Sequence, residues 1–87
     1  MKIKDGFILR EVAGNSVVVA VGKRAKEFNG VINLSGAGAD IWKHLQKDIS
    51  KEELIDRLLE EYDVEREVLT KDVDSFLQKI GEAGLLE

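Results

Sequence analysis

The first third of the chain carries the hydrophobic pattern of β-strands. Residues 7–12 and 16–21 are rich in apolar and β-branched side chains, which suit the pleated surface of a strand. Between them, Ala13-Gly14-Asn15 is a turn signal, because glycine and asparagine adopt positive φ at low cost. We therefore expect a β-hairpin, then a polar and basic loop over residues 22–30, and a short third strand over residues 31–34.

From residue 35 onward the apolar positions recur at helical spacing. Ser35 can cap a first helix that ends near residue 45, with Trp42 expected in the core rather than at a ligand. Ser50 to Glu53 form a capping box, in which the serine accepts a first-turn N–H and Glu53 reaches back. The apolar stripe of that second helix consists of Leu54, Ile55, Leu58, Leu59 and Tyr62.

A longer last helix is expected over residues 65–83. Gly84 follows it as a left-handed terminator, and Leu85-Leu86 can fold back onto the last turn. Its apolar face consists of Leu69, Val73, Phe76, Leu77 and Ile80.

The order of these elements predicts an α+β fold, with a three-stranded antiparallel sheet followed by three helices in a winged helix-turn-helix-like arrangement. The chain has 87 residues, 44 % hydrophobic and 34 % charged, which suits a single domain over residues 1–87. So small a core leaves little room for a deep active-site cavity.

The net charge of −4 is unevenly distributed. Residues 1–30 contain six Lys/Arg and three Asp/Glu, whereas residues 31–87 contain seven and fourteen. An acidic surface of this kind repels phosphate backbones, so we expect no nucleic-acid partner. The sequence also lacks an apolar run long enough for a membrane span or a secretory signal, and we expect a cytoplasmic protein without a membrane partner.

Residues with catalytic potential are few. There is no cysteine, and His44 is the single histidine. The carboxylates of residues 52–63 fall opposite an apolar helical stripe and are interpreted as a solvated face, while Gly36 and Gly38 do not form a phosphate-binding loop. The basic cluster at residues 23–26 is interpreted as a solubilising loop. We expect no enzymatic activity, no metal and no cofactor.

Several motifs occur together in a fixed order: Asn33-Leu34-Ser35, Ala37-Gly38-Ala39-Asp40-Ile41-Trp42, Ser50-Lys51-Glu52-Glu53-Leu54, Leu58, Tyr62, Val64, Asp72-Val73, Phe76-Leu77, Ile80 and Ala83-Gly84-Leu85-Leu86. With these motifs the chain resembles the PqqD family, also called RiPP recognition elements, from about Val17 onward.

The resemblance implies a non-catalytic peptide chaperone. Such domains hold the leader segment of a ribosomally synthesised precursor peptide and present it to a modifying enzyme, often a radical S-adenosylmethionine (SAM) maturase. In the founding case the product is coenzyme PQQ (pyrroloquinoline quinone). The leader adds as an extra strand to the third strand and packs against the last helix.

Carried onto this sequence, the resemblance implies a groove with two walls. One wall is the third strand, with about 13 Å of edge, where Ile32 and Leu34 point to one side and Val31 and Asn33 to the other. The other wall is a shoulder of the last helix, where Phe76 fits a groove and a core equally well. The expected peptide-binding residues are Val31, Ile32, Asn33, Leu34, Val68, Asp72, Phe76 and Lys79.

Two other functions fit the same elements. A winged helix could bind nucleic acid, although the last helix carries more acidic than basic residues, contrary to a recognition helix. The chain could also be a structural subunit that docks on a maturase without touching its substrate. An exposed edge strand can pair with a second copy, so we expect a monomer or a weak homodimer.

Overall fold

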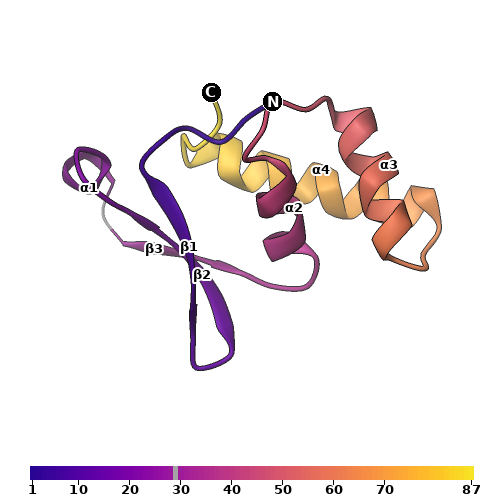
Figure 1. Cartoon of the computed structure of the whole chain (residues 1–87), viewed down its shortest axis with the longest axis horizontal. Coiled ribbons are helices and arrows are strands. Elements are labelled where there is room, and N and C mark those ends of the chain that lie inside the picture. Colours follow the sequence, from indigo (N-terminus) through magenta and orange to yellow (C-terminus); the bar gives the residue numbers. More distant parts are fainter. Residues whose placement is uncertain (29) are drawn as a thin grey trace.

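Residues 1–28 and 30–87 are described by the computed structural model (Figure 1). Their strands and helices follow in this order: β1 (Phe7–Val12), β2 (Asn15–Ala20), α1 (Arg24–Glu27), β3 (Val31–Leu34), α2 (Gly38–His44), α3 (Lys51–Glu61) and α4 (Arg66–Glu82).

The three strands form one antiparallel sheet in the order β1-β2-β3. Ala13 and Gly14 connect β1 to β2 with φ values of 51° and 82°, and positive φ at both central residues is the mark of a type I′ hairpin turn. The register places Val18 opposite Leu9 on one side and Ile32 on the other. This order leaves β3 at an edge of the sheet.

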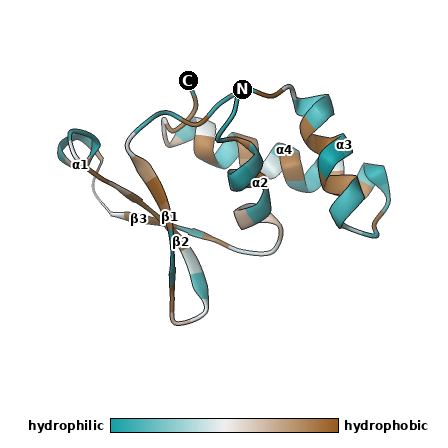
Figure 2. Cartoon of the chain, viewed as in Figure 1, coloured by the Kyte–Doolittle hydropathy of each residue, from teal (hydrophilic) through white to brown (hydrophobic). Residues whose placement is uncertain are grey.

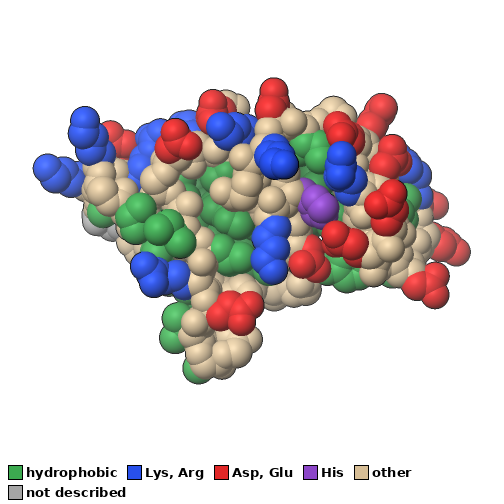
Figure 3. All heavy atoms as spheres, viewed as in Figure 1, with side chains coloured by type: hydrophobic (Ala, Val, Ile, Leu, Met, Phe, Trp, Pro, Cys, Tyr) green, Lys and Arg blue, Asp and Glu red, His purple; other side chains and the backbone are tan. Residues whose placement is uncertain are grey.

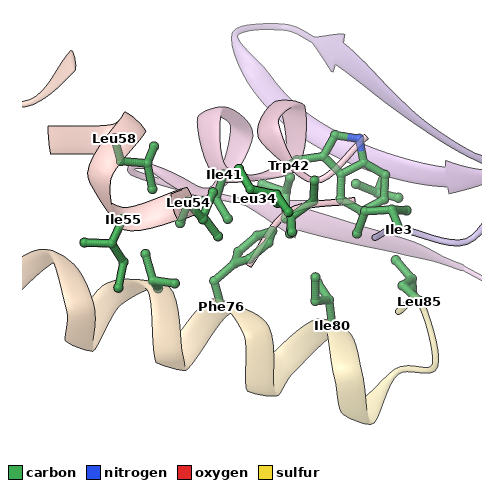
Figure 4. Packing of buried hydrophobic residues seen from close by; sticks show 14 of the residues in the cluster. Ile3, Leu34, Ile41, Trp42, Leu54, Ile55, Leu58, Phe76, Ile80 and Leu85 are labelled. Atoms are coloured by element: carbon green, nitrogen blue, oxygen red, sulfur yellow. The ribbon is translucent and has the colours of Figure 1, made fainter. Parts of the chain in front are cut away.

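The helices α2, α3 and α4 lie together to one side of the sheet (Figure 1). Apolar and polar residues alternate along α3 and α4 (Figure 2), and the buried residues of both helices are apolar. Trp42 is 2 % exposed, which confirms its predicted place in the core. Every layer contributes to that core: Ile3, Val18, Ile32, Leu34, Ile41, Trp42, Leu45, Ile49, Leu54, Ile55, Leu58, Leu69, Val73, Phe76, Ile80 and Leu85 (Figure 4). The predicted α+β fold, with its sheet followed by helices, is confirmed.

The local signals at helix ends act largely as expected. The Ser50 hydroxyl accepts a hydrogen bond from the Glu53 amide at 3.1 Å, but the Glu53 carboxylate accepts from Arg57 at 3.2 Å instead of reaching back. Gly84, with φ of 83°, ends α4. The Leu85 amide then donates to the Ile80 carbonyl at 3.0 Å, as in a Schellman motif.

Two predictions of local structure are wrong. The stretch predicted as a loop over residues 22–30 contains the single-turn helix α1, and residue 29 of that stretch lies outside the described residues. Ser35 does not cap a helix, because α2 begins only at Gly38 with Ala37 at its N-cap and no side-chain cap bond. Gly36 explains the delay, since its φ of 57° is incompatible with a right-handed helical turn.

The first residues of the chain run between two later segments. The Ile3 amide donates to the Leu45 carbonyl at 3.0 Å, and the Lys4 amide donates to the Leu85 carbonyl at 2.8 Å. Ile3 also forms a β-bridge with Leu86. Both chain ends therefore lie close to one another (Figure 1).

Candidate functional site

The hydrogen-bonding direction of β3 follows from the register of the sheet. Opposed residues in antiparallel strands alternate between pairs that exchange both backbone hydrogen bonds and pairs that exchange none. Val21, just after β2, donates to Gly6 at 2.8 Å, and Ala20 next to it is opposite Phe7. Counting back from Val21 in steps of two, the backbone groups of Val19 and Val17 face β1. Those of Val18 and Ser16 therefore face β3.

The same alternation decides which groups of β3 are free. Ser16 is opposite Leu34 and Val18 is opposite Ile32, so the N–H and C=O groups of Ile32 and Leu34 face β2. The N–H and C=O groups of Val31 and Asn33 consequently face the open edge. An extended peptide that adds to β3 therefore pairs with these two residues.

Side-chain burial follows the predicted alternation of β3. Ile32 and Leu34 are 9 % and 8 % exposed, whereas Val31 is 56 % exposed. The side chain of Ile32 is therefore in the core, and its backbone groups are bonded to β2. The predicted binding strand contributes its open edge through Val31 and Asn33.

A pocket of about 350 Å³ opens beside the end of β3. It lies between the segment that leads into α2 and the facing side of α4. Phe76 projects from α4 toward Leu34 and Ile41 and forms the apolar floor (Figure 4). The pocket is lined by Leu34, Ser35, Gly36, Ala37, Gly38, Ile41, Asp72, Ser75, Phe76 and Lys79.

The pocket brings together four of the eight predicted residues: Leu34, Asp72, Phe76 and Lys79. Phe76 is 9 % exposed and belongs to the core, while its ring also lines the pocket. The two places expected for Phe76, in the groove and in the core, are therefore compatible. Val68 is 51 % exposed and does not line the pocket. It lies eight residues before Phe76, about 12 Å along the helix axis.

Gly38 and Ser75 were missed by the sequence interpretation, together with the other lining residues of the 35–41 segment. A Cβ at position 38 would lie 3.3 Å from both Leu34 Cβ and Phe76 Cε2. Glycine at this position therefore lets α2 approach α4 closely enough to form the pocket wall. A glycine at the start of an apolar helix was the available signal.

Lys79 links the two walls. Its ammonium donates to the carbonyl of Asn33 at 2.9 Å, across 46 residues of sequence. This bond agrees with the register, because it requires the Asn33 carbonyl to face away from β2. Asp72 lies at the other end of the pocket, two helical turns from Lys79.

The wall formed by α2 is tied to the end of α3. The Tyr62 hydroxyl donates to the carboxylate of Asp40. This hydrogen bond, reinforced by partial burial, raises the pKa of Tyr62 to about 12. Because Tyr62 is the C-cap residue of α3, this bond ties the end of α3 to the first turn of α2.

The single histidine and the acidic side chains of α3 lie outside the pocket. His44 pairs with Glu61 at 3.1 Å on the surface, and acidic side chains crowd the end of the molecule near α3 (Figure 3). Among residues 1–28 and 30–87, three or more potential metal ligands do not gather at any point. Within the same residues, each helix is too short or too polar to cross a lipid bilayer.

A known protein family and a solved structure are similar to this chain. The family described as coenzyme PQQ synthesis protein D (PqqD) matches residues 15–86. The chain belongs to the PqqD family. This membership confirms the resemblance seen in the sequence. Curated protein sequences give no significant match.

A solved structure also matches this member of the PqqD family over its whole length. It is described as TbiB1 in complex with the TbiA(beta) leader peptide, and it is 26 % identical with a TM-score of 0.75. The alignment covers 100 % of this chain and 95 % of the other. The similarity therefore extends to the sheet, the pocket segment and α4 together.

Proposed function

We propose that this PqqD-family domain captures the leader segment of a ribosomally synthesised precursor peptide and presents it to a modifying enzyme. The observation that carries the proposal is the open edge of β3 beside the pocket on α4. A similar structure, that of TbiB1, is described with a leader peptide bound. The role is one of binding, without catalysis by this chain.

In the proposed complex the peptide adds as a fourth strand along Val31 and Asn33. Their two N–H and two C=O groups face outward, and in the free protein Lys79 donates to one of these carbonyls. Pairing of the peptide with all four groups supplies about 2–6 kcal/mol, short of the ~8 kcal/mol of a micromolar complex. Burial of apolar surface therefore has to supply the rest of the affinity.

The pocket is the place where that burial occurs. Its floor of Leu34, Ile41 and Phe76 is apolar, and its volume of about 350 Å³ accepts a large side chain. One buried aromatic or leucine side chain contributes about 1.5–3 kcal/mol. We infer that the bound peptide carries such an anchor next to the residues that pair with Asn33.

The partner enzyme is a peptide-modifying enzyme, and a radical SAM maturase fits the family best. The chaperone role needs the peptide to remain accessible while it is held. A strand added at the sheet edge keeps one of its own edges open to a second protein. The product of the pathway is coenzyme PQQ or another modified peptide.

Nuclear magnetic resonance titration tests the proposal. Synthetic peptides that cover the N-terminal parts of small proteins encoded beside this gene are added to isotope-labelled protein. We expect amide shifts at Val31, Asn33, residues 35–38 and the α4 face from Asp72 to Lys79. Saturable shifts confined to other regions would refute the groove, and a lack of binding by all of these peptides would refute leader capture.

A duplex DNA titration at low salt is the matching control. The surface near α3 is acidic (Figure 3), and phosphate backbones bind proteins chiefly through basic side chains. We expect no shift in an electrophoretic assay. Tight binding of DNA would instead support the winged-helix alternative.

A further inference from the structure

The bond between Lys79 and Asn33 places a positive charge on the edge where the peptide is proposed to pair. Lys79 lies in the last turn of α4, and its ammonium donates to the Asn33 carbonyl at 2.9 Å. Both residues are exposed. The bond therefore occupies an acceptor that would otherwise be open to solvent or to another strand.

An open sheet edge is prone to pair with other chains, and lysine is one of the residues that guard such edges. An antiparallel partner of β3 would exchange both hydrogen bonds with Asn33. The Asn33 carbonyl cannot be fully available to an incoming N–H while the ammonium holds it. Peptide entry therefore displaces Lys79, whose flexible four-carbon stem can move without any shift of α4.

The displaced ammonium needs a new partner in the bound state. Asp72 lies about 10 Å away along the helix axis, at the far end of the pocket. Glu82 is three residues after Lys79, and its carboxylate accepts from Gln78 at 3.2 Å with further lone pairs open. Glu82 and an acidic side chain of the peptide are therefore the candidate acceptors, and of the two only the peptide side chain makes the new ion pair depend on which peptide is bound.

We propose that Lys79 guards the empty edge of β3 and, once displaced, selects peptides with an acidic residue beside Asn33. The inference rests on the proposed function and adds the charge of the substrate. Asp72 at the opposite end of the pocket disfavours a second acidic residue there. The preferred ligand is an extended peptide with an acidic residue at the β3 end of the groove and a neutral or basic residue at the Asp72 end.

Selection from a random peptide library displayed on messenger RNA tests this specificity without knowledge of the natural leader. The library is selected in parallel against the wild-type protein, Lys79→Glu and Lys71→Glu. The last variant is the matched control, because Lys71 lies exposed on the same helix and does not line the pocket. Wild type and Lys71→Glu should enrich Asp or Glu at one position, and Lys79→Glu should enrich Lys or Arg there.

Affinities of one selected peptide give the magnitude. Replacement of its acidic residue by the amide should weaken binding to wild type about two- to fivefold, as for an exposed ion pair. The same replacement should have no effect on Lys79→Met, which keeps the apolar stem without the charge. Amide spectra establish whether each variant is folded. If Lys79→Glu does not fold, Lys79→Met provides the test.

Two outcomes separate the inference from the function on which it rests. If selected peptides shift the resonances of β3 and α4 but show no acidic preference that depends on Lys79, the charge selection is wrong and peptide capture stands. If no selected peptide binds at β3, both proposals fall.

Discussion

Gly38 packs so closely against Phe76 that a Cβ at position 38 would lie 3.3 Å from Cε2 of the phenyl ring. The same Cβ would lie 3.3 Å from the Cβ of Leu34, which is fixed to the backbone of β3. Helix α2, strand β3 and helix α4 thus meet at one point. The close packing of these three elements beside the pocket depends on the absence of a side chain at position 38.

Replacement of Gly38 by leucine should therefore destabilise the protein by about 1–3 kcal/mol, as expected for overpacking. Gly81 is the matched control, because it is helical and its Cβ would make an ordinary contact at 3.8 Å with Leu86. Gly81→Leu should leave stability unchanged or raise it by up to about 1 kcal/mol. Urea unfolding of both variants measures the difference, and equal effects would contradict the close packing.

A proline scan of β3 tests which backbone groups are free. Asn33→Pro removes an N–H that faces the open edge, so the fold should persist, while affinity for a leader peptide falls about two- to tenfold or more. Ile32→Pro removes an N–H that faces β2 and should unfold the sheet. Circular dichroism reports the folding and peptide titration the affinity. Similar damage by both prolines would show that the register has been misread.

The pair formed by Tyr62 and Asp40 gives a pH dependence. Because the fold raises the pKa of Tyr62 from 10.0 to about 12, the bond contributes fully to stability below pH 10. The contribution is lost as the pH rises from 10 to about 12. Tyr62 is the single tyrosine, so tyrosinate absorbance follows it directly.

The corresponding control is Asp40→Asn, which should bring the pKa of Tyr62 back toward 10. Tyr62→Phe should cost about 1–3 kcal/mol, since hydrogen bonds to charged groups exceed the average. A tyrosinate transition near pH 10 in the unmodified protein would show that the two side chains are not bonded in solution.

Two adjacent leucines after α4 differ in burial, and their substitutions should differ in their effect on stability. Leu85 is completely buried, whereas Leu86 is partly exposed. Leu85→Ala should cost about 2–5 kcal/mol, because it leaves a cavity in the core. Leu86→Ala should cost clearly less. Chemical denaturation of the two variants decides, and the reverse order would mean that the tail packs differently.

Much of the fold was predictable from the sequence because its signals are local. The alternation of Ile32 and Leu34 with exposed neighbours was read correctly, and so were the Ser50 cap and the Gly84 terminator. Helix α1 could not be predicted, since a single turn has no apolar period. Ser35 was misread because Gly36 overrides its capping tendency through backbone geometry.

The site was less predictable, because it forms between segments far apart in the chain. The spacing of Asp72, Phe76 and Lys79 placed them on one side of a helix, and the pocket confirms that they share it. The same spacing also included Val68, since helical periodicity does not tell where along the axis the facing wall ends. The bond from Lys79 to Asn33 has no sequence signal, as it depends on the tertiary distance between two surfaces.

The path of residues 1–4 has a consequence for folding during synthesis on the ribosome. Ile3 is buried between a carbonyl at residue 45 and the β-bridge to Leu86. Residues 1–4 therefore lack their complete native neighbourhood until Leu86 has left the ribosomal exit tunnel. Closure of the core is a late event, and during translation the apolar hairpin stays unprotected and open to chaperones that attend nascent chains.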